Sequence, residues 1–358
     1  MCHFRQWREI SRSVELTVRN LPGYPLFILF GHLFYRFLPF GTPGFRVNCF
    51  SCLCGAAATL VLFLFCQRWY ASRGYRASCG WALLAAGSWA FSPLLWQYHV
   101  QAEVFSLNNL IVALQFLLAQ LHYEACVLPD RRDGADGGDD ADTRKRRART
   151  MARLGALAVG LGFSNQHAIV FYSLPIVAVV FMTDMGHHGN VTEPAFFASL
   201  VGYGFIGLTP YALMPWSASR GDLAQLGSWG DQRTFGGLMK HFLRQEYGTF
   251  RLYSGTDMAY VSIFKWMQLY AGNLSENFML IGPVLFLAGL LAVVSTGVCV
   301  CVCVCVCVCV CVFVCVYVCV PEVGSHLLRL HSVEPAGARG WPGSREFCLL
   351  LGGLPQPG

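Results

Sequence analysis

Charged residues are scarce in this chain of 358 residues, and that scarcity is the first guide to its class. Asp, Glu, Lys and Arg together make up 13% of the sequence, about half of their usual share in soluble domains, whereas hydrophobic residues make up 55%. The formal net charge of +6 is concentrated in loops, which argues against a nucleic-acid-binding protein. Residues 1–20 are polar and lack an apolar core, so we expect no cleavable signal peptide.

What the sequence does have is long apolar runs. A helix that crosses a bilayer needs about 20 consecutive apolar residues. Windows of about this length without any charged residue cover residues 47–67, 77–102, 104–123, 154–183, 195–219 and 277–298. We therefore expect an all-α, polytopic membrane protein whose helical bundle has about 6–8 membrane segments. Residues 21–41 contain Pro, Gly and Arg36, and we expect them to form a helix that lies in the membrane interface.

Two loops rich in Arg and Lys flank the second and third windows. The first loop carries Arg68, Arg73 and Arg76, and the second lies in residues 125–150, with its basic residues at 144–149. Two spans separate these loops, so both face the same side of the membrane. Because basic residues near span ends mark the cytosolic side, we place both loops in the cytosol and Glu103, which lies between them, in the lumen.

The window at residues 154–183 allows two interpretations. It is either one long tilted helix or two short helices that meet at residues 164–167. We prefer two, because the polar residues 165–167 would be costly in the middle of a bilayer. This choice puts residues 216–276 in the lumen. The glycosylation sequons at Asn190 and Asn273 do not decide between the interpretations, since both lie close to a predicted span.

Cysteine is abundant only because of one tract. Nine of the 17 cysteines alternate with Val in residues 298–320, which repeated TG dinucleotide would encode. We interpret this tract as a translated microsatellite and residues 321–358 as a non-native tail. The remaining cysteines lie mostly in apolar windows and are expected to be buried free thiols. The spacing of Cys52 and Cys54 does not suit zinc, and neither a metal site nor a cofactor is expected.

Polar residues that could bind a substrate occur in three groups. Glu103 lies at a membrane boundary, where a carboxylate either contacts an acceptor hydroxyl or merely interacts with a helix dipole. His167 and its neighbours could contact a lipid-linked phosphate, although a structural histidine fits equally. The third group lies in residues 228–250, where an aromatic ring and a carboxylate suit a sugar and two basic residues suit a phosphate. The candidates are Glu103, Asn165, His167, Trp229, Asp231, Lys240 and Arg244.

Several longer motifs resemble a known family. They read PGYPLF, PFGTPGFRVN, QAEVFSLNN, GFSNQHAIV, GLTPYALMP and SWGDQRTFGGLMKHFLRQEYGTF. Together they resemble the transmembrane protein 260 family of protein O-mannosyltransferases. The resemblance implies a GT-C-like bundle in the endoplasmic-reticulum membrane, with its core in residues 21–297 and a lumenal active site. It also implies dolichyl-phosphate mannose as the donor and the IPT domains of plexin-type receptors as acceptors.

One family motif is missing from this sequence. Members of the family carry an acidic Gly-Asp-Ser-Gly-Glu motif after their first span, and its Asp is the expected general base. The sequence lacks this motif, and residues 1–20 do not fit the family pattern, so we interpret the chain as truncated or wrongly assembled at both ends. We expect the chain as printed to be inactive, and no catalytic residue is assigned. The alternatives are a transporter or channel and a non-catalytic membrane scaffold.

Overall fold

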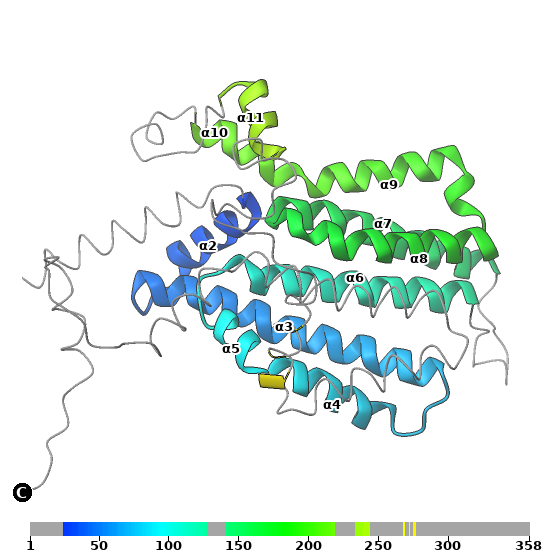
Figure 1. Ribbon diagram of the computed structural model, residues 1–358. Helices are drawn as coiled ribbons and strands as arrows, with labels where there is room; N and C mark the ends of the chain where they lie inside the picture. Colours follow the sequence, from blue (N-terminus) through cyan, green and yellow to red (C-terminus); the bar gives the residue numbers. More distant parts are fainter. Residues whose placement is uncertain are drawn as a thin grey trace, which may run out of the picture. The chain divides into compact units, whose positions relative to one another are not determined.

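The computed structural model describes residues 24–127, 141–218 and 233–243, together with Gln268, Gly272, Ser275 and Glu276. The chain divides into two units, Met1–Val316 and Tyr317–Gly358, and every described residue belongs to the first. The secondary structure of the described residues is entirely helical, which confirms the predicted all-α class (Figure 1).

The long helices follow the apolar windows. The α-helices are α2 (Pro25–Phe37), α3 (Pro43–Ser72), α4 (Ser78–Ala90), α5 (Pro93–His99), α6 (Val104–Val127), α7 (Ala141–Asn165), α8 (Val170–His187), α9 (Pro194–Gly207), α10 (Leu213–Ala218) and α11 (Phe235–Phe242). The 3-10 turns are η1 (His167–Ile169), η2 (Asn190–Thr192) and η3 (Thr209–Ala212).

Three stretches within the described residues are long and apolar enough to cross a membrane: α3, α6 and the joined turn and helix His167–His187. A fourth arises if α9 and the segment Thr209–Trp216, bent by 44° relative to each other, count as one span. The window at residues 277–298 lies outside the described residues, so the total of about 6–8 segments stays a prediction.

The window at residues 77–102 is not one continuous helix, and whether it crosses the membrane once stays a prediction. It divides into α4, of 13 residues, and α5, of 7 residues, and each is shorter than the about 20 residues that cross a bilayer. The break falls at Pro93, which occupies the first turn of α5. A proline has no N–H to donate and is tolerated at the start of a helix, but it disrupts a helix interior. The absence of charge across this window does not predict the break.

The window at residues 154–183 contains two helices, as we preferred. The first, α7, ends at Asn165, and α8 begins at Val170 after the turn η1. The Asn165 end of α7 contacts the start of α6, because the Asn165 side chain donates to the Val104 carbonyl oxygen. The other end of α7 reaches the residues that follow α8, because Arg149 donates to Asn190. The two helices therefore run in opposite directions.

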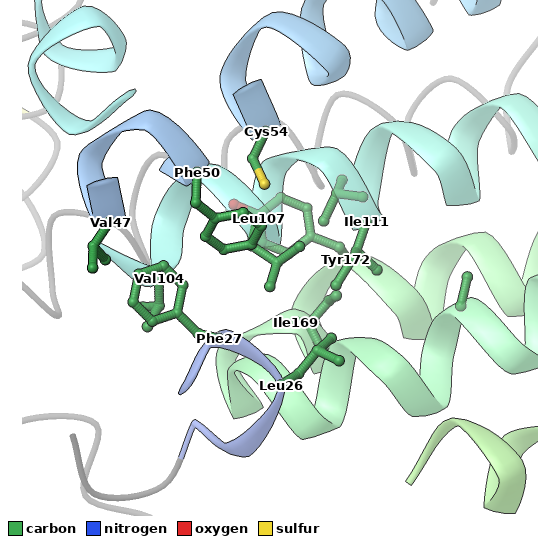
Figure 2. Packing of buried hydrophobic residues seen from close by; sticks show 12 residues of the cluster. Leu26, Phe27, Val47, Phe50, Cys54, Val104, Leu107, Ile111, Ile169 and Tyr172 are labelled. Atoms are coloured by element: carbon green, nitrogen blue, oxygen red, sulfur yellow. The ribbon is translucent and has the colours of Figure 1, made fainter. Parts of the chain in front are cut away.

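The main core lies where α2, α3, α6 and α8 meet (Figure 2). Phe50 of α3 is at its centre. The centroid of its ring lies 5.6 Å from that of Phe27 and 5.2 Å from that of Phe34, both on α2. Leu107 of α6 and Ile169 of η1 complete the cluster. Between helices that cross a membrane, close van der Waals packing of this kind rather than transfer from water stabilises the arrangement.

One arginine fastens the turn between α2 and α3. The Arg46 guanidinium donates to the carbonyl oxygens of Tyr35 at 3.1 Å and of Phe40 and Gly41 at 3.2 Å. Gly41 has a φ of 80°, a conformation that only glycine adopts readily. The start of α3 is capped by Thr42, whose hydroxyl accepts from the Phe45 N–H. The turn is thus held both by the Arg46 side chain and by the cap at the start of α3.

Helices α7 and α9 cross at glycines. A Cβ atom on Gly160 would overlap the Gly204 carbonyl oxygen and lie 2.9 Å from the Gly207 Cα. A Cβ atom on Gly207 would lie 2.5 Å from the Leu157 carbonyl oxygen. Backbone meets backbone here, as in the close crossings of membrane helices that use small residues.

Both basic loops lie at the same end of the bundle. Arg68, near the end of α3, pairs with Glu124 of α6 at 2.9 Å. Ala148 of α7 packs against Ala125 and Cys126 at the same end of α6. Glu103 lies just before Val104, at the start of α6 and therefore at its other end. The separation of Glu103 from the basic residues is confirmed, while the side of the membrane that each faces stays a prediction.

Candidate functional site

The candidate site lies where α6 begins and α7 ends, and we call Glu103, Asn165, His167, Tyr211 and Phe242 the polar end. Glu103 directly precedes α6, and its backbone N–H donates to the Gln101 carbonyl oxygen at 2.8 Å. Its side chain is half-buried, and its carboxylate has no hydrogen bond or ion pair with another described residue. Burial raises the pKa of Glu103, so its carboxyl group is well placed to exchange a hydrogen bond with a bound hydroxyl.

Asn165 connects the end of α7 to the start of α6, next to Glu103. It is fully buried, and its Nδ2 donates to the carbonyl oxygen of Val104, the residue after Glu103, at 3.1 Å. Its Oδ1 is also buried but has no hydrogen-bond partner in the described part of the chain. A buried acceptor without a partner is costly, and such groups are frequent where a ligand binds.

His167 lies in contact with two other segments. Its Nε2 is 3.5 Å from the Tyr211 hydroxyl, which donates to the Phe163 carbonyl oxygen at 3.2 Å. Its ring centroid is 5.5 Å from that of Phe242 in α11, and Tyr211 and Phe242 are 5.2 Å apart. Lys240 lies two residues before Phe242 on the same helix and is exposed. The polar end thus includes a helix that carries a cation.

The structure places four of the seven predicted residues. Glu103, Asn165 and His167, which are up to 64 positions apart, converge at one end of the bundle, and α11 brings Lys240 to the same end. The side chains of Trp229, Asp231 and Arg244 lie outside the described residues, so their part in the site stays a prediction.

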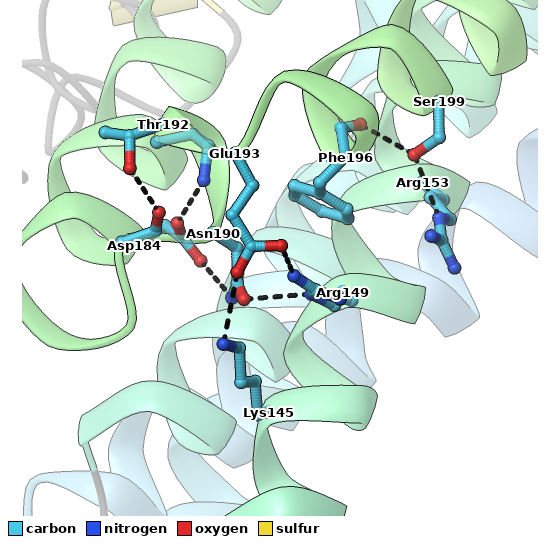
Figure 3. Close-up of polar contacts among 11 residues, drawn as sticks. Lys145, Arg149, Arg153, Asp184, Asn190, Thr192, Glu193, Phe196 and Ser199 are labelled. Carbon is cyan, nitrogen blue, oxygen red and sulfur yellow. Dashed lines mark hydrogen bonds and ion pairs between the residues drawn. The ribbon is translucent and has the colours of Figure 1, made fainter.

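A second polar group lies at the opposite end of the bundle, and the sequence analysis missed it (Figure 3). We call it the Asp184 cluster. Both oxygens of the buried Asp184 carboxylate accept hydrogen bonds at 2.8 Å, from the Asn190 side chain and from the Val191 N–H. Arg149 donates to Asn190 Oδ1 at 2.9 Å and pairs with Glu193. Asn190, a potential glycosylation site by sequence, is fully buried in this cluster.

On α6, two further residues face Asp184. His122 Nε2 lies 3.8 Å from Asp184 Oδ1, and Cys126 Sγ lies 3.7 Å from the His122 ring nitrogens. The signal that would have found them is the spacing of His122 and Cys126, four residues apart within a predicted helix. Asp184 could not have been added from spacing, because it is 58 positions beyond Cys126 along the chain.

The six cysteines among the described residues are free thiols, as expected. Cys54 and Cys126 are buried, whereas Cys52 and Cys79 are exposed, so the expectation of burial holds only in part.

Comparison with known proteins decides the family. Residues 9–189 match the family model described as "Protein O-mannosyl-transferase TMEM260 N-terminal domain". The chain belongs to the TMEM260 family. The match includes Glu103, Asn165 and His167, and it begins at residue 9, earlier than the motifs quoted above indicated.

Curated members of the TMEM260 family are similar over most of this chain. The protein O-mannosyl-transferase tmem260 of Dictyostelium discoideum is 32% identical over 280 residues, which cover 77% of this chain and 32% of that protein. The mouse protein O-mannosyl-transferase TMEM260 is 35% identical over 243 residues, which cover 68% of this chain and 31% of the relative. The chain thus spans about a third of the length of these relatives. No solved structure matches significantly.

Proposed function

We propose that this chain forms part of the membrane-embedded substrate site of a protein O-mannosyltransferase. The observation that carries the proposal is the family match over residues 9–189, within which three predicted site residues converge. The donor is dolichyl-phosphate mannose, and the acceptor is a Ser or Thr hydroxyl of an IPT domain in a plexin-type receptor. The polar end faces the lumen of the endoplasmic reticulum.

The side chains of the polar end, together with Lys240 of α11, suit this reaction. Transfer of mannose forms a bond from the hydroxyl oxygen to the sugar, breaks the bond from the sugar to the dolichyl phosphate, and requires a base to take the hydroxyl proton. Lys240 and His167 offer N–H donors to the phosphate that leaves. The Glu103 carboxyl group and the unpaired Asn165 Oδ1 offer acceptors to sugar or acceptor hydroxyls. The general base belongs to the acidic family motif and is not assigned to any residue of this chain.

The test begins with the chain as printed, which we expect to give no transfer in membranes supplied with dolichyl-phosphate mannose and a plexin IPT domain. With a relative's first span and its Gly-Asp-Ser-Gly-Glu motif placed ahead of Leu21, transfer should appear. General-base assistance alone contributes about 10²–10⁴-fold. A restored chain that folds but stays inactive would favour the scaffold alternative.

In the restored chain, Glu103→Gln should lower the rate of transfer about tenfold, as expected for a lost charged hydrogen bond to a substrate. The melting temperature should not fall. Burial raises the pKa of Glu103, so the folded chain favours the protonated carboxyl group. The stability that this group contributes is therefore present at low pH and is lost as the pH rises through its pKa in the folded chain, whereas the neutral Gln side chain carries no such loss. Cys52→Ser, on an exposed position of α3, is the matched control and should change neither quantity. A lower melting temperature with an unchanged rate would contradict the proposed role.

A further inference from the structure

The end of the bundle opposite the polar end buries three side chains of kinds that bind metal ions. His122 and Cys126 lie one turn apart on α6, and Asp184 reaches them from α8. One ligand atom from each residue lies within 4.8 Å of the other two. None of these side chains contributes to the proposed transfer reaction, because the polar end lies at the other end of α6.

The spacing of these atoms fits a small dication. Bonds of about 2.0–2.3 Å to a tetrahedral zinc ion place neighbouring ligand atoms about 3.3–3.8 Å apart. The distance from His122 Nε2 to Asp184 Oδ1 is 3.8 Å, and that from Cys126 Sγ to the His122 ring is 3.7 Å. Cys126 Sγ is equally far from both ring nitrogens of His122 and lies within 4.8 Å of an Asp184 oxygen, so binding one ion requires the Cys126 and His122 side chains to reorient.

The charge of the site also favours a cation. The Asp184 side chain is 2% exposed, and its two hydrogen bonds come from neutral donors, the Asn190 amide and the Val191 N–H. Arg149, the arginine of the Asp184 cluster, is bound to Asn190 Oδ1 and to Glu193. A carboxylate buried in this way requires a compensating positive charge. Each of its oxygens has a second lone pair that could bind a metal.

His188 is the candidate for a fourth ligand, although its ring nitrogens do not lie within 4.8 Å of all three ligand atoms and its side chain would have to turn toward them. His188 follows the last turn of α8, four residues after Asp184, and interacts electrostatically with His122. Its Nε2 is buried and has no hydrogen-bond partner among the described residues. Two histidines, one cysteine and one aspartate form a ligand set with the softness that zinc prefers.

We propose that His122, Cys126, Asp184 and His188 bind one Zn²⁺ ion that holds α6 and α8 together. The Cys126 thiol gives its proton to solvent when it binds. Asn190 donates a hydrogen bond to the Asp184 carboxylate, and Arg149 donates one to Asn190. Such hydrogen bonds to the ligands orient them around many metal sites. Once His188 turns in, four protein ligands close the site, so the role that we propose for the metal is structural.

The test uses the full chain, purified in detergent, with the nine cysteines of residues 298–320 changed to Ser so that they do not bind metal. After addition of Co²⁺, we expect one ion per chain and the absorption of a thiolate bound to tetrahedral cobalt. Cys126→Ser should abolish the thiolate band, and His188→Ala should weaken Co²⁺ binding at least tenfold. Cys54→Ala, which removes a buried thiol from α3, should leave both unchanged.

A second readout does not depend on the variants being well folded. A chelator should lower the melting temperature of the parent chain, and Zn²⁺ should restore it, because a ligand of the folded state stabilises that state. The proposal is overturned if a helical parent chain binds no Co²⁺, if Cys126→Ser keeps the thiolate band, or if the chelator leaves the melting temperature unchanged.

Discussion

Gly160→Ala should destabilise the folded chain by about 3 kcal/mol, although it adds a single methyl group. The new Cβ would overlap the Gly204 carbonyl oxygen and press against the Gly207 Cα, and both are backbone atoms of α9. Neither can move away by changing a rotamer, so α9 must shift away from α7. The measurement is the melting temperature of the purified chain in detergent, followed by size-exclusion chromatography.

Gly155→Ala is the matched control, because it lies on the same helix and its added Cβ would meet no atom within 4 Å. Removal of a helical glycine stabilises an exposed helix by up to about 1 kcal/mol. We therefore expect the two variants to change the melting temperature in opposite directions. Equal melting temperatures would mean that α7 and α9 do not cross as closely as described.

Arg149→Ala should lower the free energy of unfolding by about 2 kcal/mol, the second largest loss of stability that we expect. The substitution removes the donor to Asn190 Oδ1, an acceptor that is fully buried. It also removes a guanidinium that lies 5.1 Å above the ring of Phe196. The ion pair with Glu193 contributes less, because the Glu193 side chain is 43% exposed and solvent screens it.

Arg147→Ala tests whether charge alone explains such a loss. Arg147 lies on the same helix and is exposed. Its replacement changes the net charge by the same amount but should alter the stability by less than about 0.5 kcal/mol. Urea or thermal unfolding of the two variants in parallel gives the comparison. Similar losses in both would show that the hydrogen bond to Asn190 is unimportant.

The long helices could be predicted because their signal is local. Residues 47–67 and 104–123 contain no charge over a length that spans a bilayer, and α3 and α6 include them. The reversal at Asn165 was also predictable, since three consecutive polar residues are costly inside a membrane. Breaks at single prolines were less visible, and the division of residues 77–102 at Pro93 went unnoticed.

The sites could be predicted only where a motif was contiguous. Asn165 and His167 lie two positions apart, and Glu103 was identified because it lies at the edge of an apolar window. The Asp184 cluster is different, because its members come from α6, α7, α8 and η2, and only the packing of these helices brings them together. Each member alone looks like an ordinary helix residue, so no local pattern distinguishes it.

The three hydrogen bonds of Arg46 have a mechanical consequence. The guanidinium is itself fixed to α3, and it binds carbonyl oxygens at the end of α2 and in the turn that follows. These bonds limit how far the end of α2 can move relative to the start of α3. Phe50 packs against Phe27 of α2 and shares a core with Leu107 of α6, so the position of α2 is linked by packing to the start of α6, where Glu103 lies. A lysine at position 46 has one ammonium group in place of the planar guanidinium of arginine. It could not bind all three carbonyl oxygens in this geometry, so α2 would be less firmly held to α3.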